Sequence, residues 1–186
     1  MATRSVLLAL ILTPMLWSAL AEAADSREVR FKVKYSGSSM STHADTNDDG
    51  LRAGLGNVTG KSNLGLYTSQ GVGEAFIIGP ATCPNGNPGI NLGILPGTGH
   101  TVSWFEKTRD LVFSEITSET VCYDPATRMQ FKSGTARITG GTGRFVGATG
   151  NTQFEGTQWP LYVDADGNGF AAQTGTSTGT IILLRE

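Results

Sequence analysis

The chain has 186 residues, of which 39% are hydrophobic, 16% are charged and 25 are glycine. This length fits one domain that is large enough to bury a hydrophobic core. The net charge of −2 and the lack of a run of Lys and Arg argue against nucleic acid as a partner.

The chain begins with features of a secretory leader. Arg4 supplies a positive charge, residues 6–12 are an apolar run, and small residues up to Ala23 fit a cleavage site. The run is shorter than the about 20 residues that a membrane-spanning helix needs. We predict a signal peptide over 1–23, a mature domain over 24–186 that is secreted or periplasmic, and no membrane span after cleavage. An uncleaved anchor is the alternative.

Along the mature chain, apolar and polar residues repeatedly alternate with a period of two, which is typical of β-strands. In residues 29–35, Phe31, Val33 and Tyr35 share one face, while Lys32 and Lys34 share the other. Turn sequences such as CPNGNPG and DADGNG separate the alternating segments. Further strands are expected over 64–79, 128–139, 150–163 and 170–185. Two more are expected within 100–124, where they meet at a short turn near 107–110.

The number of strands and the lack of crossover helices predict an all-β fold. We expect a single closed antiparallel eight-stranded barrel, because closure removes the unpaired edges of a sheet. An antiparallel sandwich is the other arrangement that such a pattern allows.

The stretch TGGTGRFVGATG, residues 139–150, looks at first like a nucleotide-binding loop. The glycine templates of such loops require a glycine where the chain has Val146, and a helix must follow. The sequence after Gly150 lacks helical character. We therefore interpret the stretch as a strand, a glycine turn, an apolar plug of Phe145 and Val146, and a second strand.

The same residues carry a family resemblance. ITGGTGRFVGATG (138–150), together with THADTNDDG (42–50), resembles the allene oxide cyclase and dirigent-type β-barrels, in particular their exported bacterial relatives. The resemblance implies an eight-stranded antiparallel barrel whose lumen holds a small apolar molecule. In the plant proteins the cavity holds a reactive intermediate, but the polar groups that assist lie outside the shared hairpin, so no catalytic residue is carried over.

Candidate lumen residues follow from the strand alternation. If Lys107 and Asp110 face solvent, the side chains that alternate with them point inward, where a glutamate among aromatic rings would have a raised pKa and could act as acid or base. Core packing by the aromatic residues, with the glutamates at the rims, is the alternative, and a slip of one residue would invert every assignment. The candidates are Glu115 and Glu106 for catalysis and Tyr35, Trp104, Phe113 and His100 for ligand binding.

Two further features concern the loops. Cys83 and Cys122 are predicted to form a disulfide in an oxidising compartment, with free thiols as the alternative. Asp45, Asn47 and Asp49 match the start of a calcium loop, but the twelfth position is glycine, so a site there would be weak. A polar hairpin turn explains the same residues.

These observations predict an exported barrel that binds a small apolar molecule in its lumen. If the protein is an enzyme, we expect it to steer a cyclisation or isomerisation without a metal or nucleotide cofactor. The alternative is a non-catalytic structural or adhesive module with a filled core, stapled by calcium at the acidic loops. Barrels of the resembled family often associate through their outer faces, so a homo-oligomer is among the expectations.

Overall fold

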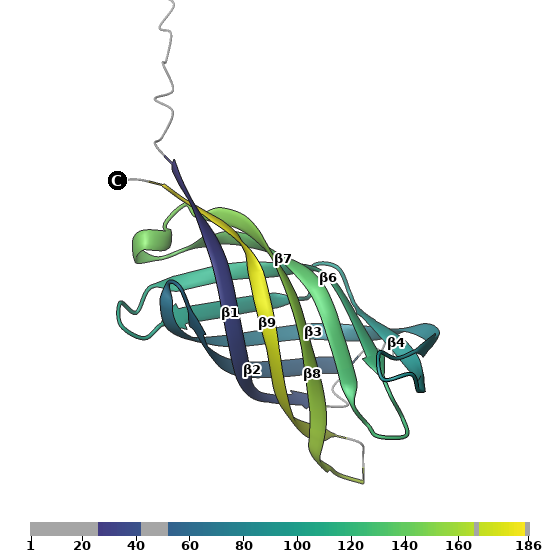
Figure 1. Cartoon of the computed structure of the whole chain (residues 1–186). Coiled ribbons are helices and arrows are strands. Elements are labelled where there is room, and N and C mark those ends of the chain that lie inside the picture. Colours follow the sequence, from purple (N-terminus) through teal and green to yellow (C-terminus); the bar gives the residue numbers. More distant parts are fainter. Residues whose placement is uncertain (1–25, 42–51, 166–167, 185–186) are drawn as a thin grey trace, which may run out of the picture.

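The computed structural model describes residues 26–41, 52–165 and 168–184. They form one antiparallel sheet whose strands are arranged in a ring, and the all-β prediction is confirmed (Figure 1). The predicted signal peptide, 1–23, lies outside the described residues. The strands are β1 (Ser26–Ser41), β2 (Arg52–Ser62), β3 (Gly65–Thr82), β4 (Pro88–Ile94), β5 (His100–Phe105), β6 (Leu111–Tyr123), β7 (Gln130–Gly141), β8 (Thr149–Val163) and β9 (Gly169–Leu184), with a short 3₁₀ turn η1 (Gly143–Phe145).

The ring has nine strands where eight were predicted, because two short strands share one position. β1 pairs with β2 and β9, and pairing continues around to β3 and β6. Between those two long strands, β5 fills one end of the gap and β4 fills the other. Pro96 and Gly97, the latter with a φ of 83°, interrupt what would otherwise be one strand.

The interior is apolar at the end of the ring that carries η1. The predicted alternation of β1 is confirmed there, since Val33 is buried and Lys32 and Lys34 are exposed. Phe31, Tyr67 and Phe105 follow one another with ring centroids 6.4 and 6.0 Å apart. The buried core cluster consists of Val33, Tyr67, Phe105, Val112, Ile138, Phe145, Ala148 and Ile181.

The glycine-rich stretch forms the connection from β7 to β8. Gly143 and Gly147 have φ values of 54° and 67°, which glycine adopts without strain. Phe145 is fully buried and stacks on Phe105 with centroids 5.0 Å apart. Val146 is 63% exposed, so of the two expected plug residues only Phe145 enters the interior. The segment that follows is the strand β8, which rules out the strand–loop–helix of a nucleotide site.

Arg144 holds this turn against the ring. Its guanidinium carbon lies 4.9 Å from the Phe105 ring centroid and 4.8 Å from that of Phe145. Its Nε lies 3.4 Å from Asp110 Oδ2, and its Nη2 donates a hydrogen bond to the Leu64 carbonyl. A cation against two aromatic faces and a carboxylate fixes the position of the plug.

The opposite end of the ring is tied by covalent and polar links. The predicted disulfide is confirmed, and it joins Cys83, just after β3, to Cys122 on β6. Beside it the buried carboxylate of Asp124 accepts hydrogen bonds from the side-chain amides of Asn85 and Asn87, each at 2.8 Å. It also accepts bonds from the Thr127 hydroxyl and the Ala126 amide. The two loops at this end are therefore linked twice.

Candidate functional site

The strand pairing reverses the expected orientation of β5. Phe105, which is 3% exposed, pairs with the buried Tyr67, so Ser103 and Phe105 face the interior. His100, Trp104 and Glu106 alternate with them and face outward, so the inward orientation predicted for these three was wrong. Lys107 misled the prediction because it lies in the turn after β5, where it does not set the alternation.

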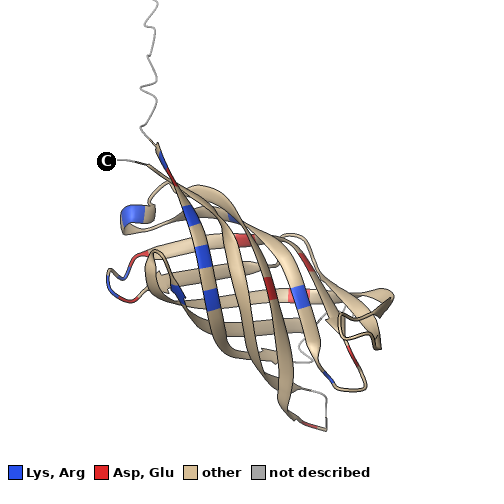
Figure 2. Ribbon diagram, in the orientation of Figure 1, with Lys and Arg blue, Asp and Glu red and all other residues tan. Residues whose placement is uncertain are grey.

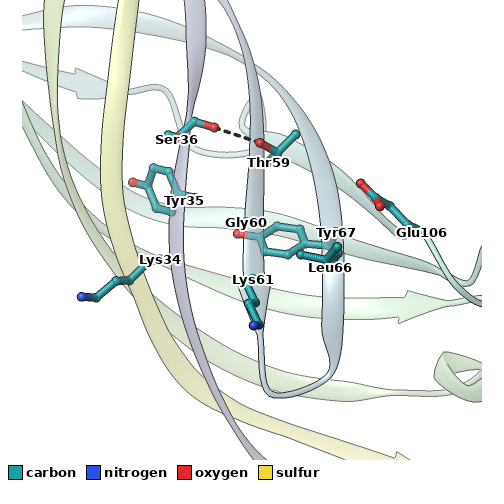
Figure 3. Close-up of a pocket in the computed structure, with 9 residues that line it drawn as sticks. All are labelled: Lys34, Tyr35, Ser36, Thr59, Gly60, Lys61, Leu66, Tyr67 and Glu106. Atoms are coloured by element: carbon teal, nitrogen blue, oxygen red, sulfur yellow. Dashed lines mark hydrogen bonds between the residues drawn. The ribbon is translucent and has the colours of Figure 1, made fainter.

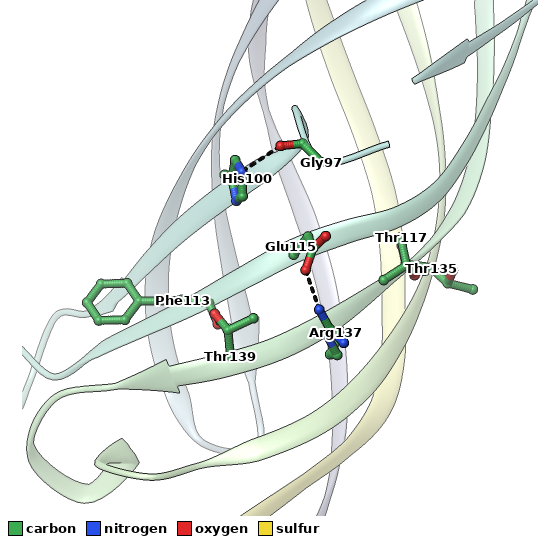
Figure 4. A network of polar contacts seen from close by, with 8 residues as sticks. All are labelled: Gly97, His100, Phe113, Glu115, Thr117, Thr135, Arg137 and Thr139. Carbon is green, nitrogen blue, oxygen red and sulfur yellow. Dashed lines mark hydrogen bonds and ion pairs between the residues drawn. The ribbon is translucent and has the colours of Figure 1, made fainter. Parts of the chain in front are cut away.

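The same correction applies to Phe113 and Glu115 on β6. Val112 is buried in the core, and Phe113 pairs with the outward-facing Val102. Glu115 pairs across the outer face with Arg137, whose side chain is 60% exposed (Figure 4). An exposed ion pair of this kind contributes about 0–1 kcal/mol to stability, so we interpret this pair as a feature of the protein surface. His100 Nε2 lies 3.0 Å from the Gly97 carbonyl oxygen on the same outer side.

Tyr35 is the one candidate that lies inside the ring as predicted. Its hydroxyl donates a hydrogen bond of 3.2 Å to the Glu155 carbonyl, two strands away. The phenol passes over two glycines, and a Cβ on Gly156 would lie 2.7 Å from the hydroxyl oxygen. Tyr35 belongs to an in-register row of inward positions around the ring, which runs Lys132, Gly156, Gly175, Tyr35, Gly60, Tyr67, Phe105.

Two charged side chains that sequence reasoning missed accompany Tyr35. Lys132 Nζ lies 3.8 Å from Glu119 Oε1, and the two side chains are only 25% and 12% exposed. Both residues face the interior of the ring, because each pairs with an inward-facing glycine. Lys132 pairs with Gly156, and Glu119 pairs with Gly134. The interior thus holds a phenol, an ammonium and a carboxylate, which we call the interior polar cluster.

Burial and mutual charge shift the pKa values of this cluster. Burial raises the pKa of Tyr35 to about 12, and the negative charges of Glu119 and Glu155 add to the effect. Burial lowers the pKa of the Lys132 ammonium, while Glu119 opposes that change. Tyr35 therefore stays a neutral hydrogen-bond donor through the whole physiological range.

The sequence carried a signal for Lys132 but none for Glu119. Lys132, Ala136 and Ile138 lie at even positions of one strand, and the buried Ala136 and Ile138 set the inward parity. On β6 the pairing shifts between Phe113 and Ser114 and again between Ile116 and Ser118. The first shift leaves the extra residue, Thr139, on β7, and the second leaves Thr117 on β6. The alternation of β6 therefore changes at Thr117, and no period-two reading could extend from Val112 to Glu119.

Glycines line part of the interior wall beyond the polar cluster, and at two of them, Gly54 and Gly56, a Cβ would fit without a clash. A Cβ on Gly54 would meet nothing nearer than the Gly73 carbonyl at 3.8 Å. A Cβ on Gly56 would lie 3.6 Å from Gln173 Nε2, which is ordinary contact. Gln173 in turn accepts a hydrogen bond from Gln158 and donates one to the Ser38 carbonyl. This half of the interior combines small wall residues with fixed amide dipoles.

A hollow of about 470 Å³ lies across β1, β2 and β3 (Figure 3). Lys34 and Lys61 line it together with Leu66 and Glu106, all of them exposed. Glu106, predicted as a lumen acid, therefore belongs to a solvent-facing surface. Tyr35 and Tyr67 form part of the lining from the inner side, next to Gly60.

The predicted calcium ligands, Asp45, Asn47 and Asp49, lie outside the described residues. Within residues 26–41, 52–165 and 168–184, no three His, Cys, Asp or Glu side chains gather at metal-binding distance. In the other acidic turn, the Asp164 carboxylate accepts hydrogen bonds from the backbone and side chain of Asn168.

Comparisons of the chain with protein-family models, with curated proteins and with solved structures found no match. None of the helical segments in the described part of the chain is long and apolar enough to cross a bilayer.

Proposed function

We propose that the ring is a closed barrel of the allene oxide cyclase and dirigent type, exported from the cell, which binds a small and largely apolar molecule inside. The observation that carries this proposal is the interior polar cluster of Tyr35, Glu119 and Lys132, placed beside an interior wall of glycines. Pockets for small molecules characteristically combine apolar walls with a few fixed polar groups.

The two halves of the interior suit different parts of such a molecule. Around Gly54 and Gly56 the wall carries no side chains, and we propose that the apolar body of the molecule lies against it. The Lys132 ammonium attracts an oxygen that carries negative charge, and Tyr35 donates a hydrogen bond. We therefore propose a ligand with an apolar body and one oxygen-bearing polar head.

A catalytic version of the proposal uses the same groups. Glu106 and Glu115 lie on the outer face and cannot reach a molecule inside the ring. In this version Glu119 stabilises a developing positive charge or accepts a proton. The reaction class remains an intramolecular cyclisation or isomerisation of the bound molecule. It needs no group beyond the side chains of this chain and a shaped interior.

A fluorescent apolar probe tests the binding proposal. N-phenyl-1-naphthylamine should bind the purified protein with an increase in fluorescence, and Gly56→Leu should abolish this by filling the space. Asn57→Leu adds the same side chain to the outer face of β2 and is the matched control. Equal binding by wild type and Gly56→Leu, with both folded by circular dichroism, would refute the proposal.

The polar head is tested with a second probe. cis-Parinarate carries a carboxylate on an apolar chain, so Lys132→Met should weaken its binding by about tenfold or more, as expected for loss of a half-buried charged contact. Binding of the neutral N-phenyl-1-naphthylamine should change little in the same variant. If both probes respond equally, Lys132 shapes the interior without recognising a head group.

The alternative function is a non-catalytic structural or adhesive module. The filled aromatic end, where Phe31, Tyr67, Phe105 and Phe145 pack in sequence, favours it. Failure of both probes to bind a folded protein would support this alternative.

A further inference from the structure

The outer face of β1 carries a line of cations. Arg30, Lys32 and Lys34 alternate with inward residues, and all three are exposed (Figure 2). Alternate residues of a strand lie about 6.6–6.8 Å apart, so the three charges are evenly spaced. Lys61 on β2 pairs directly with Lys34 and adds a fourth. We call these four residues the basic stripe.

The basic stripe lacks acidic partners at close range. Among the described residues no Asp or Glu lies within ion-pair distance of its members, whereas three other cations are paired. Acidic residues on the same outer surface are Glu28, at the start of β1, Glu106, beyond Leu66, and Glu155 on β8, which is separated from Lys34 by Thr176 of β9.

Lys34 and Lys61 lie directly opposite each other on neighbouring strands. Like charges in such positions destabilise a sheet. An anion bound between them would remove that cost. The cations are also concentrated on a chain whose net charge is −2, so the positive field is local to this face.

The flank of the basic stripe is a ladder of hydroxyl groups. On β9, Thr180, Thr178 and Thr176 are the register partners of Arg30, Lys32 and Lys34. Thr178 and Thr180 can each donate and accept a hydrogen bond with a sugar hydroxyl, while the Thr176 hydroxyl donates to Glu155 Oε1 and can still accept one. Leu66, the register partner of Lys61, is exposed, but one leucine does not make the apolar face that enters a bilayer. The register partners of the four cations include no aromatic side chain on which a nucleobase could stack.

We propose that the basic stripe binds a linear anionic polysaccharide, with carboxylate or sulfate groups on the cations and sugar hydroxyls on the threonine ladder. The line of charges along one strand matches a linear chain of anions, and the flanking hydroxyls match its neutral surface. The inference is independent of the interior binding site, because its residues face the opposite side of the sheet.

Binding to immobilised dextran sulfate and polygalacturonate tests the inference, with neutral dextran as the reference. The purified protein should bind both charged polymers and elute with salt. Lys32→Thr combined with Lys34→Thr should weaken binding by about tenfold, with a shallower salt dependence, because two of four contacts are lost. Threonine suits an exposed strand position, so folding is preserved.

The matched control removes two positive charges elsewhere, through Lys107→Thr and Arg128→Asn in exposed turns. Asn suits the left-handed backbone of Arg128, whose φ is 60°. The control should bind like wild type. Equal weakening by both double variants would reduce the effect to net charge and overturn the inference. The inference would also be overturned by retention on neutral dextran, or by a lack of binding to the charged polymers at low salt. Binding of equal strength to anionic vesicles or single-stranded DNA would overturn it as well.

Failure here is distinguishable from failure of the interior proposal. The Gly56→Leu variant should keep its binding to dextran sulfate, and the Lys32→Thr, Lys34→Thr variant should keep its binding of N-phenyl-1-naphthylamine.

Discussion

Figure 1 shows η1 and β4 at different ends of the ring. At the η1 end the interior is filled by aromatic and branched side chains, whereas away from it the wall includes the glycines of β2 and the hydrogen-bonded amides of Gln158 and Gln173. The first end is stabilised by removing apolar surface from water, about 25 cal/mol for each Å². At the second end a disulfide and the Asp124 hydrogen bonds link the loops. The comparison indicates that the two ends are stabilised by different means, by apolar packing at one and by loop links at the other.

The largest effect is expected from emptying the apolar end. Phe145→Ala leaves a cavity beside Phe105 and removes the ring beneath Arg144, so unfolding free energy should fall by about 3–5 kcal/mol. Val146→Ala, at the neighbouring position that is 63% exposed, should change it by about 0.5 kcal/mol or less. Guanidinium unfolding measures both. A Phe145→Ala loss below 1 kcal/mol would contradict the plug.

The next effect concerns the covalent tie at the other end. Cys83→Ser with Cys122→Ser should lower the unfolding free energy by about 3–4 kcal/mol, since the loop that the disulfide closes spans 39 residues. Reduction of the wild-type protein by dithiothreitol should reproduce the loss, while Phe145→Ala and the disulfide variant should be additive because they act at opposite ends. Strong coupling between them would break the division into two ends.

The smallest of the three effects depends on pH. Hydrogen bonds, first from Asn87 and then from Thr127 and Asn85, hold the pKa of Asp124 well below its usual range. The lowered pKa of the folded state stabilises the fold at pH values above the unfolded pKa of about 3.9. That stability is lost progressively as the pH falls from about 3.9 towards and through the folded-state pKa. Asp124→Asn should therefore be less stable than wild type at pH 7, with the difference shrinking below about pH 4.

The control for this pH profile is Glu28→Gln, which removes an exposed carboxylate at the start of β1. Thermal melts from pH 2.5 to pH 7 should show wild type and Glu28→Gln falling together in acid. If Asp124→Asn follows the same profile as wild type, the Asp124 hydrogen bonds do not link the two loops in solution.

Part of this fold could be predicted because strands record their two faces locally. The alternation of Val33 and Tyr35 with Lys32 and Lys34 is enough to orient β1. The disulfide was predicted from two cysteines in a chain that was expected to be exported. The glycine-rich stretch also identified its own turn, since only a turn uses that many glycines so closely. Whether the chain is exported, and whether it belongs to the resembled family, stay predictions.

The candidate site was harder to predict because a single residue of register decides it. Glu106 and Glu115 were expected inside and lie outside, since the turn after β5 contains Lys107 and gives no parity. The bulge at Thr117 on β6 then places Glu119 inside although it is an odd number of residues from the buried Val112. Pairing between strands distant in sequence sets these positions, and alternation within one strand cannot report it.

By itself the sequence determined most of the strands, though not β4. It also determined their polar and apolar faces where alternation runs unbroken, the cysteine pair and the hairpin that presents Phe145. The tertiary structure alone decided which face of β5 and β6 looks inward, that β4 and β5 share one place in the ring, and that Tyr35, Glu119 and Lys132 meet. The first set depends on neighbours a few residues apart, and the second depends on pairings between residues that can lie more than a hundred positions apart in the chain.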